Sequence, residues 1–110
     1  MTKDTEKAFV IIYSEYLRRR SFGTSKNQAV RFDNSKLLAI DGFANWNQDD
    51  IGYCLQELRK IGFIKVDIWG DVTLLETGIE YIEAKPKEYF LVFAGIVKDL
   101  LSLVSGFLPI

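Results

Sequence analysis

The sequence predicts an α+β fold that is mostly α-helical, with a helix-and-hairpin domain at residues 1–84 and an apolar helix at residues 85–110. A helix is indicated at residues 48–61, where apolar side chains recur at helical spacing between a capping Asn and a terminating Gly. The residues that follow alternate between apolar and polar, turn at a Gly-Asp pair and return, which is the pattern of a β-hairpin. Beyond Pro86 the chain is more apolar than elsewhere, which predicts a separate C-terminal element.

The first helix is expected over residues 3–20. Its last turn holds Arg18, Arg19 and Arg20, where positive charge interacts favourably with the helix dipole. With Lys26 and Arg31 the same arginines form a basic patch suited to nucleic-acid phosphates, and both interpretations are kept. The apolar side chains that share one face of this helix are Phe9, Ile12, Tyr13, Tyr16 and Leu17.

Two short elements are expected before the helix at residues 48–61. Residues 29–32, with the sequence AVRF, are a candidate strand. A short helix capped by Asn34 or Ser35 follows, and a turn at residues 41–45 leads to the next helix. The expected buried side chains of this short helix are Leu37, Leu38 and Ile40.

The helix at residues 48–61 has clear start and stop signals. Asn47 is a good N-cap, and Gly62 ends the helix because glycine adopts the left-handed cap conformation without strain. Trp46 and Ile51 can pack together as a hydrophobic staple. The expected buried stripe is Ile51, Cys54, Leu55, Leu58 and Ile61, which makes Cys54 an inert core thiol.

A hairpin is predicted at residues 63–75, with Gly70 and Asp71 as a two-residue turn. The structural interpretation of its tip is that Trp69 covers the edge of the core. A capping box at residues 77–80 then begins another helix. The apolar strand face is expected to hold Ile64, Val66 and Ile68, and the following helix carries Ile79, Tyr81 and Ile82.

The order of helix, glycine, apolar strand, tight hairpin and Thr-Gly-led helix resembles the winged helix-turn-helix family. The similarity is carried by CLQELRKIGFI, at the junction of the third helix and the wing, and by LLETGIEYIE, where the wing meets the next helix. It covers most of residues 1–84 and is closest to small bacterial and phage winged-helix proteins. The resemblance implies that residues 29–32 pair with the wing. It also implies that the helix at residues 48–61 enters the major groove of double-stranded DNA.

The resemblance also implies which side chains would contact DNA. Glutamines can read adenine edges, a tyrosine can contact a phosphate or a thymine methyl group, and a glycine lets the backbone approach closely. Acidic residues on or beside the same face, such as Asp49, Glu57, Asp67 and Asp71, lower the affinity for phosphates. The expected groove contacts are Gln48, Gly52, Tyr53, Gln56 and Lys60. The expected phosphate contacts are Arg18, Arg19, Arg20, Lys26, Arg31, Lys36, Arg59 and Lys65.

Residues 89–110 would be apolar over most of the circumference of a helix, and such a helix must be covered. The favoured cover is the chain's own domain together with the same helix of a second copy. The alternatives are a membrane interface and a membrane span, although Lys98 and Asp99 would be costly in the middle of a span. The expected dimer contacts are Phe90, Phe93, Val97, Leu100, Leu101, Val104 and Phe107.

The composition argues against several kinds of site. One cysteine and no histidine exclude an intrachain disulfide, a Cys/His zinc site and nucleophiles activated by histidine. No catalytic constellation or glycine-rich phosphate loop is visible, so we expect no enzyme activity, no cofactor and no metal. The N-terminal residues are too charged for a signal peptide, and a cytoplasmic location is expected.

The sequence therefore favours a DNA-binding transcriptional regulator that dimerises through its C-terminal helix. The alternative is a winged-helix module that binds another protein and no nucleic acid, with membrane contact through residues 89–110 as a variant. The charge distribution supports this alternative, because residues 34–84 hold four basic and nine acidic side chains. A positive surface over the helix at residues 48–61 would favour DNA, and a negative one a protein partner.

Overall fold

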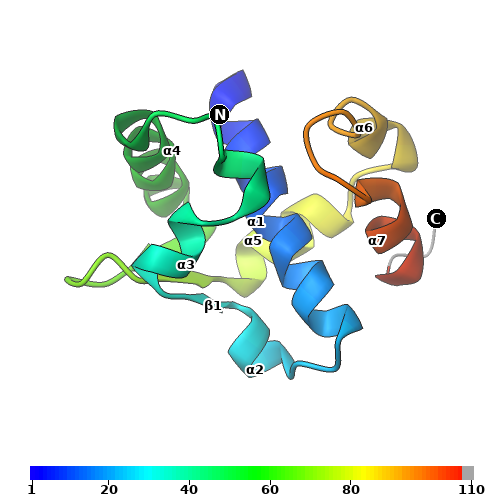
Figure 1. Ribbon diagram of the computed structural model, residues 1–110, viewed down its shortest axis with the longest axis horizontal. Coiled ribbons are helices and arrows are strands. Elements are labelled where there is room, and N and C mark those ends of the chain that lie inside the picture. The colour runs from blue at the N-terminus through cyan, green and yellow to red at the C-terminus, as the bar shows by residue number, and fades with distance from the viewer. Residues whose placement is uncertain (108–110) are drawn as a thin grey trace.

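Helix α1 (Lys3–Ser21) is the centre of the fold in the computed structural model, which describes residues 1–107 (Figure 1). Every side chain from Ala8 to Ser14 is buried, so this helix is covered on all sides and not along one stripe. Helix α4 (Gln48–Ile61) and helix α7 (Leu100–Phe107) both pack against α1. Figure 1 shows them on opposite sides of it.

The remaining elements are short and surround α1. The predicted class, α+β and mostly helical, is confirmed. In chain order they are α2 (Lys26–Ala29), β1 (Arg31–Phe32), α3 (Asn34–Leu38), the 3-10 helix η1 (Asp41–Phe43), β2 (Ile64–Val66), β3 (Val72–Leu74), α5 (Glu76–Glu83) and α6 (Lys87–Leu91).

The three strands form one antiparallel sheet in the order β1-β3-β2. The expectation that residues 29–32 pair with the hairpin is confirmed for Arg31 and Phe32. Ala29 instead ends α2, which the sequence did not predict and which begins after the N-cap Ser25. The register places Arg31, Thr73 and Lys65 in one row across the sheet.

The capping signals of α4 are confirmed. The Asn47 side chain accepts a hydrogen bond from the Asp49 N–H at 2.8 Å, and Gly62 has a φ of 91° in the left-handed region. The prediction that Ile61 is buried is wrong, because its side chain is 42% exposed. At about 100° per residue, Ile61 lies at the edge of the stripe that Cys54 and Leu58 define.

The predicted caps of the two shorter helices are wrong by one or two residues. Helix α3 is capped by Asp33, whose Oδ1 accepts the Lys36 N–H at 2.9 Å, one residue before the predicted caps. Helix α5 begins after Leu75, whose N–H donates to the Phe63 carbonyl, so the sheet sets its start and no side chain caps it. Gly78 lies against that same turn, where an added Cβ would be 2.8 Å from the Phe63 carbonyl oxygen.

The hairpin has shorter strands and a longer turn than predicted. Asp67 N–H donates to the Asp71 carbonyl and Gly70 N–H donates to the Asp67 carbonyl, which closes a three-residue loop with Gly70 at a φ of 83°. The ladder ends at the pair Val66 and Val72, so the next residues project with the turn. The predictions that Ile68 shares the apolar strand face and that Trp69 covers the core are therefore wrong.

The prediction of one continuous C-terminal helix is also wrong. The chain forms α6 and α7, separated by a turn that includes Asp99 at a φ of 60°. This reversal lets both short helices bury apolar side chains within the chain, which one straight helix could not do. Residues 108–110 and the Phe107 side chain, which the prediction included, lie outside the described part. Within residues 1–107, no helix has the length and apolarity needed to cross a membrane.

Candidate nucleic-acid interface

The outward face of α4 is open to solvent. All five residues predicted to enter the groove are exposed, on the side of the helix opposite its buried stripe. Four of the five, all except Gln48, line a hollow of 310 Å³ together with Asp49 and Glu57. Among these five, Gln56 alone makes a side-chain hydrogen bond with another described residue, accepting from Arg59 Nε at 2.9 Å. The amide donor of Gln56 is left for another partner.

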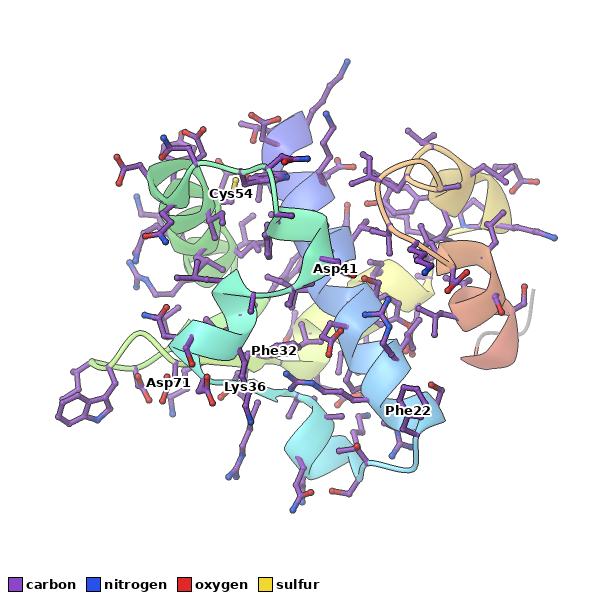
Figure 2. The ribbon with its side chains drawn as sticks, in the orientation of Figure 1. Phe22, Phe32, Lys36, Asp41, Cys54 and Asp71 are labelled. Carbon is purple, nitrogen blue, oxygen red and sulfur yellow. The ribbon has the colours of Figure 1, made fainter. Side chains whose placement is uncertain are left out.

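The hairpin projects from the edge of the molecule where α4 ends. Helix α4 passes through Gly62 into β2, and Figure 1 shows the turn of the hairpin extending beyond the rest of the chain. The base of the hairpin is fixed to α3, because Asp71 Oδ1 accepts the Asn34 N–H at 2.9 Å. Figure 2 shows Asp71 and Lys36 where α3 meets the hairpin. A ligand that spans this edge would meet α4 and the hairpin together.

A second, larger hollow of 1380 Å³ lies over the sheet and extends to the loop before α7. Arg31 and Lys65 line it on either side of Thr73, and Lys98 approaches from the loop before α7. In the described part of the chain these three cations make no side-chain hydrogen bond and no ion pair. Lys98 was not predicted, because a continuous C-terminal helix would have placed it far from the sheet.

The large hollow is not uniformly positive. Its six basic side chains are matched by six acidic ones, so the formal charge of its lining is zero. Among the acids, Asp33, Asp67 and Asp71 accept backbone hydrogen bonds, and Glu15 pairs with arginines. The backbone hydrogen bond from Lys36, together with the Ser35 hydroxyl, lowers the pKa of Asp33. These carboxylates therefore help to hold the fold in place and also balance the cations around them.

The arginine run at the end of α1 is largely engaged in contacts within the chain. Arg19 donates to the Arg31 carbonyl at 2.6 Å, pairs with Glu15 at 3.4 Å and stacks 4.2 Å above the centre of the Phe32 ring. Arg18 pairs with Glu15. Arg20 donates to the Thr24 carbonyl at 3.0 Å. These side chains tie α1 to the segment that follows it.

Some of the other predicted phosphate contacts are also engaged within the chain, and some are not. Lys26 pairs with Glu76 at 2.9 Å, and this hydrogen bond raises the pKa of Lys26. Lys36 lies 3.8 Å from Asp33, its own helix cap. Arg59 is bound to Gln56, as described above. Within the described residues, Arg31 and Lys65 are thus the predicted phosphate contacts whose side chains make neither a hydrogen bond nor an ion pair.

The predicted dimer contacts are mostly covered by the chain itself. Five of them are buried in the core that α1 shares with α6 and α7, and Leu101 is half-buried. The apolar side chains that this segment exposes are different ones: Leu91, Val92 and Ile96. The buried five are Phe90, Phe93, Val97, Leu100 and Val104.

Cys54 lies on the buried side of α4, and burial raises the pKa of its thiol. A raised pKa keeps the group as a thiol at neutral pH, which makes it a poor nucleophile. No cluster of three or more metal-ligating side chains occurs in the part of the chain that the structure describes. No protein-family model matches the chain, and no solved structure gives a significant match to it.

Proposed function

We propose that this chain is a winged helix-turn-helix protein that binds double-stranded DNA and regulates transcription. In this assignment α3 and α4 are the helix-turn-helix pair and the β2–β3 hairpin is the wing. The element order and the strand order β1-β3-β2 support it. The observation that carries the proposal is an uncovered outward face of α4 beside a projecting hairpin, because this pair of elements can contact adjacent parts of a duplex.

The available side chains fit the two parts of such a contact. Gln48 and Gln56 present amide groups that match adenine edges, and Tyr53 offers a hydroxyl and a ring. Lys60 extends the same face toward a phosphate. Arg31 and Lys65 would hold phosphates of the strand that crosses the sheet.

We propose further that the regulator acts as a two-fold dimer, since two half-sites are the usual target of this class of protein. Because the predicted contacts are buried, the second copy would meet the exposed Leu91, Val92 and Ile96. Val92→Asp should then give a monomer in a measurement of molar mass. A dimer that persists in this variant would contradict this surface.

The test of DNA binding is the salt dependence of the affinity for a non-specific duplex. The logarithm of the affinity should fall linearly with the logarithm of the salt concentration, with a slope of about −0.9 for each phosphate neutralised. Replacing both Arg31 and Lys65 by Ala should reduce this slope by about 2. Arg20→Ala is the matched control, because that arginine already binds the Thr24 carbonyl. Absence of binding at low salt by the folded protein would overturn the proposal.

The second candidate is a module that binds another protein. The balanced charge of the large hollow favours it, and so does the apolar tip of the hairpin at Ile68 and Trp69. Both features are typical of protein interfaces, where aromatic anchors carry much of the binding energy. This candidate replaces the first one if the folded chain does not bind DNA.

A further inference from the structure

We propose that the hairpin tip, Ile68 and Trp69, is an apolar wedge that inserts between stacked base pairs of the duplex and bends it. This inference rests on the proposed DNA binding and specifies how the hairpin would take part. Groove and phosphate contacts are made by polar and charged side chains. A wedge acts instead through contact with the faces of the bases.

The side chains at the tip are largely exposed among the described residues. Ile68 is 90% exposed and Trp69 is 75% exposed, although both are large and apolar. They are adjacent in sequence at the most projecting turn of the chain. Keeping two such side chains in water is unfavourable, and a contiguous exposed apolar site of this kind commonly marks a binding surface.

The loop that carries the tip is held in one conformation. Asp67 Oδ1 accepts hydrogen bonds from the Trp69 N–H at 2.9 Å and from the Asp71 N–H at 3.0 Å. Asp71 in turn accepts the Asn34 N–H, which anchors the loop to α3. A loop fixed before binding loses little conformational freedom when it inserts.

The position of the tip favours DNA as its partner. The hairpin projects at the edge of the molecule where α4 ends, so a duplex held by α4 would pass the tip. Lys65, three residues before the loop, has no side-chain partner among the described residues and can hold the adjacent phosphate. Isoleucine is among the side chains that insert between base steps, and an indole ring stacks on any base.

The experiment uses the fluorescence of Trp69 and the bend of the DNA. The chain has two tryptophans, and Trp46 packs edge-on against Phe43, so Trp46→Phe leaves Trp69 as the only indole. Titration with a non-specific duplex should quench its emission through stacking. A duplex labelled at both ends should show shorter end-to-end distances with the wild-type chain. Trp69→Ala should weaken binding about tenfold and abolish the bend.

Phe22→Ala is the matched control, because Phe22 is an exposed aromatic side chain at the far end of α1 (Figure 2). It should change neither affinity nor bend, whereas Trp69→Phe should restore most of the affinity lost in the Ala variant. If the chain binds DNA with the expected salt dependence but Trp69 is not quenched and the duplex stays straight, the wedge is overturned. The proposed function would remain intact. Absence of duplex binding by the folded chain at low salt would overturn both proposals.

Discussion

Two surfaces of this chain were predicted to bind DNA. The side chains of one are exposed to solvent, and those of the other are bound to groups of the chain itself. The outward face of α4 presents Gln48, Tyr53 and Lys60 to solvent without side-chain partners in the described residues. The end of α1 presents three consecutive arginines, each of which already binds a carbonyl or a carboxylate of the chain. The surface with more positive charge is therefore the one with fewer available donors.

The difference follows from what lies next to each helix. Helix α1 is central, so its last turn meets the backbone of α2 and β1, where carbonyl groups need donors. A guanidinium group has five N–H donors and satisfies such carbonyls well. Within residues 1–107 the outer side of α4 is exposed to solvent, and its own carbonyls are bonded within the helix. Position in the fold thus decides whether a basic residue stabilises the protein or remains available to a ligand.

The largest effect expected from this comparison is on stability. Arg19→Ala should lower the free energy of unfolding by about 3 kcal/mol, because it removes charged hydrogen bonds and a cation–π contact. The partners of Arg19 in these interactions are the Arg31 carbonyl, the Glu15 carboxylate and the Phe32 ring. The measurement is a urea unfolding curve followed by circular dichroism.

Arg18→Ala is the control for this prediction. Arg18 makes its one pair with Glu15, so its replacement should change the unfolding free energy by less than about 1 kcal/mol. At low temperature, where both variants are folded, both should bind DNA like the wild type. If the folded Arg19→Ala variant binds DNA more weakly and its stability is unchanged, the arginines at the end of α1 are DNA contacts after all.

The parts of the fold predicted correctly are those set by local chemistry. The Asn47 cap, the Gly62 stop and the alternation in β2 depend on a few neighbouring residues, and the structure has all three. The strand at Arg31 was also found, because its pairing was implied by the resemblance of the chain to winged helices. The start of α5 was missed by two residues, since the hydrogen bond from Leu75 to Phe63 sets it and no capping side chain does.

The site was predicted less well than the fold. Whether a side chain is available to a ligand depends on residues that are distant in the sequence. The groove residues of α4 were implied by the resemblance to winged helices, and all five are exposed. No local signal shows that Arg19 reaches the carbonyl of Arg31, twelve residues later. Nor does helical periodicity reveal that the chain reverses near Asp99 and brings Lys98 to the large hollow.

The second-largest effect is expected on the preference for particular DNA sequences. Gln56→Ala should reduce the discrimination between preferred and non-preferred sequences by about 2 kcal/mol, since a bidentate contact to an adenine would be removed. Binding to random duplexes should change little. Affinities for a sequence selected from a random pool and for a scrambled version measure this difference.

Gln28→Ala provides the matched control for sequence preference, because Gln28 is an exposed glutamine of α2 in the large hollow. It should leave the discrimination unchanged. Equal losses on both duplexes for Gln56→Ala would mean that α4 does not read bases.

A smaller effect is expected for a single phosphate contact. Lys60→Ala should reduce the salt slope of non-specific binding by about 1 and leave the unfolding free energy almost unchanged. Arg20→Ala should lower the unfolding free energy and leave the salt slope unchanged, because it removes a hydrogen bond to Thr24 and no phosphate contact. If Arg20→Ala lowers the slope and Lys60→Ala does not, the assignment of the two surfaces is reversed.

The smallest effect concerns Lys26, whose pair with Glu76 joins α2 to α5 at the surface. The two side chains are 48% and 59% exposed, so their coupling should be below about 1 kcal/mol at neutral pH. The hydrogen bond with Glu76 raises the pKa of Lys26 in the folded state. Its contribution is then fully present below the unfolded pKa of about 10.4 and is lost as the pH rises through the folded value.

A double-mutant cycle with Lys26→Met and Glu76→Gln isolates this coupling, because the titration of tyrosines cancels between the four proteins. The coupling should be measurable at pH 7 and should be lost as the pH rises through the raised folded-state pKa of Lys26. A coupling of zero at pH 7 would mean that Lys26 is free despite its position beside Glu76. Lys26 would then belong with Lys60 among the available cations, and Lys26→Met should lower the salt slope of DNA binding by about 1.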